Sequence, residues 1–349
     1  MNKIFKNKKV LITGNTGFKG SWLSIILDSF GAKIYGISDN YQTTPNLNSL
    51  LNYKNIINLK CDINNFNKLS NSINEIKPDF IFHLAAQSQV FKSLQDPIET
   101  YKTNIIGTVN ILESIRNTKT KCNCIFITSD KCYLNNNKKK AFKENDRLGG
   151  IDPYSASKAG AELVLFSYFN SFLKNKKNIR IGIARAGNVV GGGDWTKNRI
   201  IPDAIKAWSK NKILIIRNPS AIRPWQHVLE PINGYLMIAD ALHKDSSING
   251  EAFNFGPLHS KMYTVANVIE ELNKTWTDGK IKIKKDKNNV EDKVLKLNSN
   301  KSVGILGWKT KLNFKETIKL TGSWYYEYYS SKYNMNEITR NQIDEYFSK

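Results

Sequence analysis

The chain has 349 residues in an ordinary globular balance, 40% hydrophobic and 23% charged, with a net charge of +22. Much of that charge is lysine in loops at 138–140 and 280–287, and no nucleic-acid-binding motif accompanies it, so we expect no nucleic-acid partner. No apolar stretch is long enough to span a membrane. The short apolar run after the basic start breaks at Thr13-Gly14, unlike a signal peptide. The four cysteines lack the companions of a zinc site, which predicts free thiols, no metal and a cytoplasmic location.

The first half of the chain alternates short apolar runs with longer helical patterns. Helices are predicted after a glycine turn, through Trp22 to Leu27, and at 101–116 and 153–173. Near-continuous apolar strands between helices are typical of a Rossmann-type α/β fold with a doubly wound parallel sheet. The predicted strands are 9–13, 33–37, 56–59, 80–84, 124–127 and 179–184.

The pattern changes after Gly191, where loops lengthen and turn signals cluster. Helices are predicted at 202–210, 231–242 and 264–275, a strand at 253–256, and a helical tail from Leu320. No linker separates two units, so we expect a smaller C-terminal unit interleaved with the first. The predicted division gives 1–187 and a returning segment of about 222–257 to the Rossmann unit, and 188–221 and 258–349 to the second unit.

A glycine motif, Gly14-x-x-Gly17-x-x-Gly20, lies between the first strand and the first helix. Glycines there permit a tight turn and let the backbone approach a pyrophosphate at the helix N-terminus. Asp39 follows at about the spacing of an acid that holds ribose hydroxyls, and no nearby arginine awaits a 2′-phosphate, which favours NAD over NADP. Asp62 after the third strand is either a contact for the adenine amine or an ordinary turn acid.

A second motif, Tyr154-x-x-x-Lys158, places a phenol and an ammonium on one helix face. The cation is predicted to lower the tyrosine pKa toward neutrality and make the phenol a usable base. Tyr328-x-x-x-Lys332 matches the same spacing but has no strand or glycine loop around it. Ser129 ends a strand before the Tyr154 helix and could donate to the same substrate oxygen.

Together these motifs resemble the extended short-chain dehydrogenase/reductases. The resemblance rests on the glycine loop, His83-Leu84-Ala85-Ala86, Asn104-x-x-Gly107-Thr108 and the YSASK segment at 154–158. Narrower features resemble the nucleotide-sugar 4,6-dehydratases of that family, and the resemblance runs from about Lys8 to Trp324. These features are the segments at 13–22, 129–133, 152–155, 184–189, 191–195 and 223–228.

The resemblance implies that NAD oxidises C4 of a nucleotide-bound hexose, that water leaves across C5 and C6, and that the hydride returns to C6. Ser129, Tyr154 and Lys158 would serve the oxidation, with Asp130 as the acid at C6. Lys131 would be the C5 base or its electrostatic partner. CDP-glucose is the implied substrate, and deoxyhexoses of bacterial surface polysaccharide (O-antigen, lipopolysaccharide) are the implied destination. A dTDP-glucose dehydratase, which usually carries Asp-Glu at 130–131, a nucleotide-sugar 4-epimerase and a non-catalytic NAD-binding sensor are the alternatives.

The resemblance also implies two sets of binding residues and a homodimer or homotetramer. The NAD set is Gly14, Thr16, Gly17, Phe18, Lys19, Gly20, Asp39, Asp62, Ile63, Leu84, Ala85, Ala86, Thr103, Tyr154 and Lys158. The nucleotide-sugar set is Gln87, Asn188, Trp195, Arg199, Arg217, Arg223 and Gln226, in which the arginines suit a diphosphate.

Overall fold

The computed structural model describes residues 2–41, 43–135, 141–258, 262–284, 295–330 and 334–349. Lys332, the lysines at 138–140 and those at 285 and 287 lie outside the described residues. None of the helices in the described part is long and apolar enough to cross a membrane.

Within the described residues, seven parallel strands form the main sheet, in the order β11-β6-β5-β4-β1-β2-β3. The central strands are buried on both faces, which explains their uninterrupted apolar sequences. The sequence prediction of a Rossmann-type parallel sheet is therefore confirmed. The strands are β1 Lys9–Thr13, β2 Lys33–Ser38, β3 Ile56–Lys60, β4 Phe80–His83, β5 Cys122–Ile127, β6 Ile179–Ala186 and β11 Ala252–Phe255.

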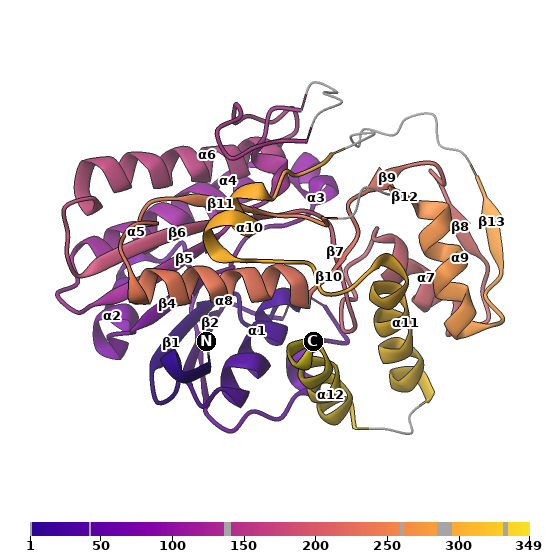
Figure 1. Ribbon diagram of the computed structural model, residues 1–349. Helices are drawn as coiled ribbons and strands as arrows, with labels where there is room; N and C mark the ends of the chain where they lie inside the picture. Colours follow the sequence, from indigo (N-terminus) through magenta and orange to yellow (C-terminus); the bar gives the residue numbers. More distant parts are fainter. Residues whose placement is uncertain (1, 42, 136–140, 259–261, 285–294, 331–333) are drawn as a thin grey trace.

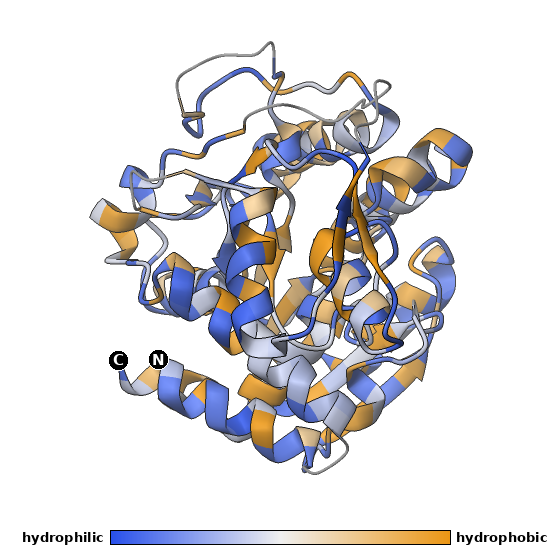
Figure 2. Cartoon of the chain, turned by 90° about the vertical axis from the view of Figure 1, so that its right-hand side faces the viewer, coloured by the Kyte–Doolittle hydropathy of each residue, from blue (hydrophilic) through white to orange (hydrophobic). Residues whose placement is uncertain are grey.

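Helices cover both faces of this sheet (Figure 1). One face packs against α1 and α8, and the other against α2, α5 and α6, so that each face has its own apolar core. In Figure 2 the helices carry hydrophilic and hydrophobic residues side by side, as expected for helices with one face on a core. The helices of this unit are α1 Phe18–Ser29, α2 Phe66–Ile76, α3 Val90–Gln95, α4 Pro97–Tyr101, α5 Gly107–Arg116, α6 Pro153–Tyr168 and α8 Leu229–Lys244.

Most of the remaining elements lie beyond the carboxyl ends of the strands on one side of the sheet (Figure 1). Among the residues that the structure describes here, three small two-stranded sheets join β7 to β10, β9 to β12 and β8 to β13. The strands are β7 Val189–Val190, β8 Leu214–Ile216, β9 Ile222–Arg223, β10 Gln226–His227, β12 Tyr263–Thr264 and β13 Ile281–Ile283. The helices are α7 Ile200–Trp208, α9 Val265–Trp276, α10 Asn300–Leu306, α11 Phe314–Ser330 and α12 Met335–Ser348.

The remaining elements are short helical turns, two of which form part of helices predicted from the sequence. The helix predicted over 101–116 is built from the end of α4, a π-helical stretch and α5, and the helix predicted over 153–173 is α6 followed by a second π-helical stretch. The predicted tail helix is two helices, α11 and α12, and β8 and β13 were not predicted. The turns are η1 Asn2–Ile4, η2 Asn48–Leu50, η3 Lys102–Ile106, η4 Asp130–Cys132 and η5 Phe169–Leu173.

The predicted interleaving of two units is visible in the return of α8 and β11 to the main sheet, where β11 pairs with β6. However, α10 packs on β11 and α8, and α12 contacts α1, although both helices fall in the second unit of the sequence division. Tyr346 of α12 donates a hydrogen bond of 2.8 Å to the buried carboxylate of Glu230 in α8. We therefore keep the division as a proposal and place α10 and α12 with the Rossmann unit.

Two buried histidines are expected to make the protein less stable in mild acid. Burial lowers the pKa of both His83 and His227 to about 3, so both are neutral in the folded protein at pH 5. The unfolded chain protonates them near pH 6.5, so their contribution is complete above that pH and is lost as the pH falls toward 3. Each should lower the free energy of unfolding by about 1.4 kcal/mol per pH unit below about pH 6.

Urea unfolding between pH 7 and pH 5 measures this slope. His227→Gln removes one of the two groups. It should therefore reduce the slope by about 1.4 kcal/mol per pH unit relative to the wild type. An equal slope in the two proteins would contradict the prediction.

Candidate active site

The glycine loop between β1 and α1 has the geometry of a pyrophosphate cradle. Gly14 has a φ of 73°, and a Cβ there would lie 2.8 Å from the backbone nitrogen of Ala85. A Cβ at Gly20 would lie 2.1 Å from the carbonyl oxygen of Gly14. Only glycine fits these positions. No side chain caps the start of α1 at Gly17, so an anion could be held by the amide groups of the first turn.

The other residues predicted to bind NAD lie mainly where parallel strands end. Asp39 follows β2 and is exposed, as is Asp62 after β3, whereas Ile63 is buried. Asp62 borders an open hollow of about 590 Å³ that Lys102 and residues 64–67 also line. Ligands of open α/β sheets bind outside the carboxyl ends of the strands, so these positions suit the adenosine half of a dinucleotide.

Three further members of the predicted NAD set lie close to this edge. The hydroxyl of Thr16 donates to the carbonyl of Asn40, just beyond β2. The ring of Phe18 lies 3.2 Å from the place of a Cβ on Gly191. Thr103 lies in η3, and its hydroxyl donates to Glu99. These positions and the open cradle fit the dinucleotide predicted from the sequence.

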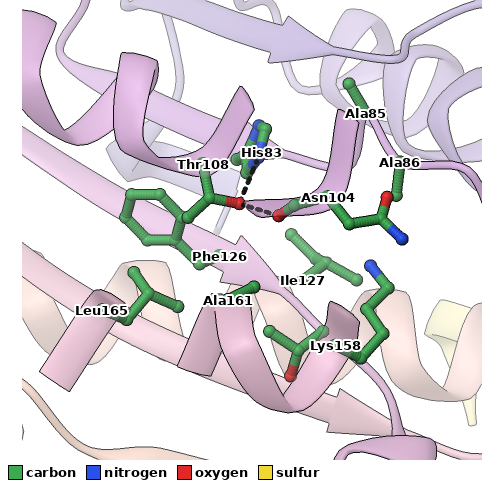
Figure 3. Close-up of a pocket in the computed structure, with 11 residues that line it drawn as sticks. His83, Ala85, Ala86, Asn104, Thr108, Phe126, Ile127, Lys158, Ala161 and Leu165 are labelled. Carbon is green, nitrogen blue, oxygen red and sulfur yellow. Dashed lines mark hydrogen bonds between the residues drawn. The ribbon is translucent and has the colours of Figure 1, made fainter. Parts of the chain in front are cut away.

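Lys158 extends from α6 toward the end of β4. Figure 3 shows its side chain pointing to the region of Ala86 and Asn104, beside a gap of about 10 Å³, roughly the space of one water molecule. Ala85 and His83 line the same gap. Leu84, the other β4-end residue of the NAD set, packs against the core. Burial lowers the pKa of Lys158 to about 8.

A second group of predicted residues meets where β5 ends and α6 begins. Asp152 caps α6, accepting a hydrogen bond of 2.9 Å from the amide of Ser155, and Pro153 opens its first turn, which holds Tyr154 beside Ser129. The Ser129 hydroxyl donates to Oδ1 of Asp130 at 3.0 Å. Lys131, the next residue of η4, favours the ionised form of Asp130 through its positive charge.

Asp130 is buried, and burial is the largest influence on its protonation. Burial raises the pKa of Asp130, although the charges of Lys131 and Lys19 and the hydroxyl of Ser129 act in the opposite direction. A raised carboxyl pKa suits a group that must act as a proton donor.

The sequence-based prediction that the pKa of Tyr154 lies near neutrality is wrong for the protein by itself. Burial raises this pKa to about 12, and the hydrogen bond with Ser129 and the charge of Arg199 offset only part of the effect. The reason lies in the direction of Lys158: its ammonium extends toward the end of β4 (Figure 3) and is not among the main influences on the phenol. Although Tyr154 and Lys158 are spaced to share one face of α6, this spacing alone does not make the charge of Lys158 a strong influence on the pKa of Tyr154.

The sequence analysis missed a buried ion pair that connects the catalytic elements. Arg185 of β6 binds both carboxylate oxygens of Glu162 in α6, at 2.8 and 2.9 Å. The same carboxylate accepts a hydrogen bond of 2.6 Å from Thr128 at the end of β5, and Arg185 donates to the Tyr133 hydroxyl beyond η4. An arginine inside an apolar strand was the available signal, because buried charges are rare unless paired.

Of the predicted substrate arginines, Arg199 is the one whose charge acts on the predicted catalytic residue Tyr154. It forms a 2.7 Å ion pair with Asp194, and its charge acts on Tyr154 and Lys19. Arg217 is exposed and donates weakly to Asn198, the neighbour of Arg199. Arg223 lies in β9, away from that pair in the sequence, and donates to the carbonyl of Ile222.

The other predicted substrate residues are mostly engaged within the protein. The Gln87 amide bonds to Gln89 and Thr100, and the Gln226 amide donates to the carbonyl of Phe255. Trp195 is buried in an aromatic cluster of α11. Asn188 lies half-buried directly after Gly187, at the end of β6. Of this group, Asn188 is the best placed to meet a ligand.

Within the described residues, no cluster of histidine, cysteine and acidic side chains could hold a metal ion. The Tyr328 of the alternative motif lies in α11 and packs on Trp195 and Trp324, far along the chain from the glycine loop and β5.

The parallel sheet, the glycine cradle and the Ser129–Tyr154–Lys158 arrangement together define the extended short-chain dehydrogenase/reductase class. The chain belongs to the family described as GDP-mannose 4,6 dehydratase, whose model matches residues 11–321. The resemblance inferred from the sequence motifs is thus confirmed.

Curated and solved relatives agree with this family. A CDP-glucose 4,6-dehydratase from Salmonella typhimurium is 39% identical over 99% of this chain and 97% of its own length. A crystal structure of dTDP-glucose 4,6-dehydratase from Bacillus anthracis in complex with NAD has a TM-score of 0.75 and 25% identity, covering 92% of this chain and 97% of that one. UDP-glucose 4-epimerase from Thermotoga maritima with UDP-glucose shares the fold, with a TM-score of 0.78 and 23% identity over 92% and 99% of the two chains.

Proposed function

We propose that the protein is an NAD-dependent hydro-lyase that converts CDP-glucose to CDP-4-keto-6-deoxyglucose. The observation that carries the proposal is the position of Asp130 and Lys131, which follow β5 directly beside Ser129 and Tyr154. An oxidation site and an acid/base pair thus share one place. The 39% identical CDP-glucose dehydratase supports the choice of substrate.

The reaction needs both sets of groups because the C5 hydrogen, which leaves together with the C6 hydroxyl, is not acidic in glucose itself. A ketone at C4 makes the C5 proton acidic, after which an acid must protonate the departing C6 hydroxyl. NAD, when bound, supplies a hydride acceptor for C4, a hydride donor for C6 and a positive charge near the phenol. Its binding would use the glycine cradle, Asp39, Asp62, and the ends of β4 and α6.

The chain's own residues would then move the protons. Tyr154 would take the proton of the C4 hydroxyl while Ser129 donates a hydrogen bond to the same oxygen. Asp130, with its raised pKa, would protonate the leaving C6 oxygen, and Lys131 would remove the C5 proton. Lys158 would hold the cofactor ribose and contribute positive charge. The Arg185–Glu162 pair joins β6 to α6, and the Thr128 hydroxyl links the end of β5 to the same carboxylate.

The diphosphate of the substrate would meet Arg199, since a guanidinium matches phosphate oxygens in two directions. Its ion-pair partner, Asp194, fixes the guanidinium where it interacts electrostatically with Tyr154. Arg217 and Arg223 would add positive charge from the neighbouring loops, and Asn188 would contact the sugar. Gln87 could do so only by exchanging a hydrogen bond that it already makes, whereas the buried Oε1 of Gln226 has no hydrogen-bond partner among the described residues and could accept one.

An exposed apolar face supports a homodimer or homotetramer. The helices α3, α4 and α6 pack on one another and together present large apolar side chains to solvent. Such a patch on a protein of this size marks a protein–protein contact. The exposed residues are Phe91, Leu94, Ile98, Leu163 and Phe166. The four cysteines are all buried free thiols, in keeping with a reducing cytoplasm.

A panel of CDP-, dTDP-, UDP- and GDP-glucose, assayed for water loss, tests the proposal. CDP-glucose should be dehydrated most efficiently, and its product should develop the absorbance of a 4-keto sugar enolate in alkali. Total NAD should stay constant, because the hydride returns to the product. Inversion at C4 without water loss would instead show that the protein is an epimerase. A preference for dTDP-glucose would show that dTDP-glucose, and not CDP-glucose, is the substrate. Binding of NAD without turnover of any sugar nucleotide would indicate a non-catalytic sensor.

A further inference from the structure

Lys19 occupies a position that local structure does not favour. It lies in the first turn of α1, where the helix dipole favours negative charge and repels a cation. Its side chain is also partly withdrawn from water, and burial together with the charge of Arg199 lowers its pKa to about 8. A residue that breaks a local rule in this way is a candidate for a functional role.

The ammonium of Lys19 lies on the side of the glycine loop where the proposed catalytic residues are found. Its nitrogen lies 3.5 Å from the hydroxyl of Tyr235 in α8, a residue whose phenol is in turn influenced by Tyr154. The charged groups that act on it are Arg199, Asp130, Lys158 and Asp194. None of these charges belongs to the Asp39 and Asp62 region predicted for the adenosine half.

Packing explains why Lys19 and Asp130 share this region. The start of α1 lies against the loop after β6, where Trp22 donates to the carbonyl of Gly192 at 2.9 Å. Oδ2 of Asp130 faces the same loop, 3.1 Å from the place of a Cβ on Gly187. The segment 187–192 therefore brings the helix that carries Lys19 and the carboxylate of Asp130 to one site.

We propose that Lys19 is a positioning residue for the elimination step, in which its ammonium stabilises the carboxylate that Asp130 becomes on giving up its proton. This inference rests on the proposed function and deepens it. During elimination the C5–H bond breaks, its proton passes to Lys131, and its electron pair forms the C5–C6 double bond. The C6–O bond breaks at the same time, and the proton of Asp130 completes the departing water molecule.

The titrating neighbours of Asp130 come from three elements. Lys131 and Cys132 belong to its own turn, Tyr154 to α6, and Lys19 to α1. The two lysines are the cations that favour its ionised form, and Lys131 must be neutral to act as the base. Lys131 gains its positive charge only as the carboxylate forms, so Lys19 is the lysine whose charge is in place before the elimination begins.

Lys19→Met, with Lys19→Arg as the charge-keeping variant, tests the proposal. At saturating NAD, which offsets any loss of cofactor affinity at this member of the predicted NAD set, the single-turnover oxidation at C4 should slow far less in Lys19→Met than the elimination. The elimination that follows, measured by decay of the reduced nicotinamide signal, should slow by about tenfold or more, a fraction of the loss of a whole general acid. Lys19→Arg should recover part of the rate, and Lys33→Met, at an exposed site, controls for net charge.

A pH profile separates this role from a structural one. The wild-type elimination rate should fall as the pH rises through about 8, where Lys19 loses its proton, and Lys19→Met should lack this step. Weaker NAD binding with normal elimination would overturn the proposal and return Lys19 to the cofactor set. A parallel loss of every readout with a lower melting temperature would also overturn it. A wild-type enzyme that releases no water from any sugar nucleotide would refute the proposed function itself.

Discussion

Tyr154→Phe is expected to lower the dehydration of CDP-glucose by about a hundred- to ten-thousand-fold, the usual contribution of a general base. The variant loses only a hydroxyl, whose described partner is Ser129, while the backbone amide of Tyr154 still donates its 3.1 Å hydrogen bond to the Ser93 hydroxyl. The fold and the melting temperature should therefore change little. Because Tyr154 acts at C4, even the first oxidation should fail in a single turnover, and no reduced nicotinamide should form.

Tyr328→Phe is the matched control, since Tyr328 heads the same sequence pattern but packs on Trp195 and Trp324. It should retain full activity. An inactive Tyr328→Phe beside an active Tyr154→Phe would mean that the other helix carries the base.

Asp130→Asn is expected to separate the two halves of the reaction. An asparagine keeps the shape of the side chain, and its Oδ1 can still accept the 3.0 Å hydrogen bond from Ser129, but it has no proton to give. Oxidation at C4 should persist, so reduced nicotinamide should accumulate in a single turnover. Water loss should fall by about a hundred- to ten-thousand-fold.

Lys131→Met completes the separation. Solvent deuterium should enter C5 in Asp130→Asn, because Lys131 can still remove the C5 proton, and this exchange should stop in Lys131→Met while oxidation persists. If Asp130 and Lys131 form only a structural pair at the end of β5, both half-reactions should weaken together with stability. Wild-type dehydration by a well-folded Asp130→Asn protein would exclude Asp130 as the acid.

The sequence motifs located most of the proposed catalytic groups before the fold was considered. Ser129, Asp130 and Tyr154 meet in the structure as their motifs predicted. The substrate set was harder to predict: Arg199 faces the catalytic residues, whereas Gln87 and Trp195 are held within loops and core. A polar or aromatic residue near a motif in the sequence can either bind a ligand or stabilise the protein's own packing. Only its neighbours in the folded structure distinguish these two roles.

The sequence by itself determined the features that depend on spacing along the chain. Continuous apolar runs specify strands buried on both faces, and the intervals of Gly14, Gly17 and Gly20 specify a turn that approaches a pyrophosphate. Such signals are local, because strand periodicity, helical faces and glycine conformations involve a few neighbouring residues. They were sufficient for the class of fold and for a prediction of where the cofactor binds.

Only the tertiary structure decided how the charges of the site act on one another. It directed Lys158 toward β4 so that burial governs the pKa of Tyr154, joined Arg185 to Glu162, and set Lys19 among the groups around Asp130. The physical reason is that the strength of a charge's effect depends on its distance from other charges and on the exclusion of water. Both are set when β5, β6, α1 and α6, far apart in sequence, pack around a common site.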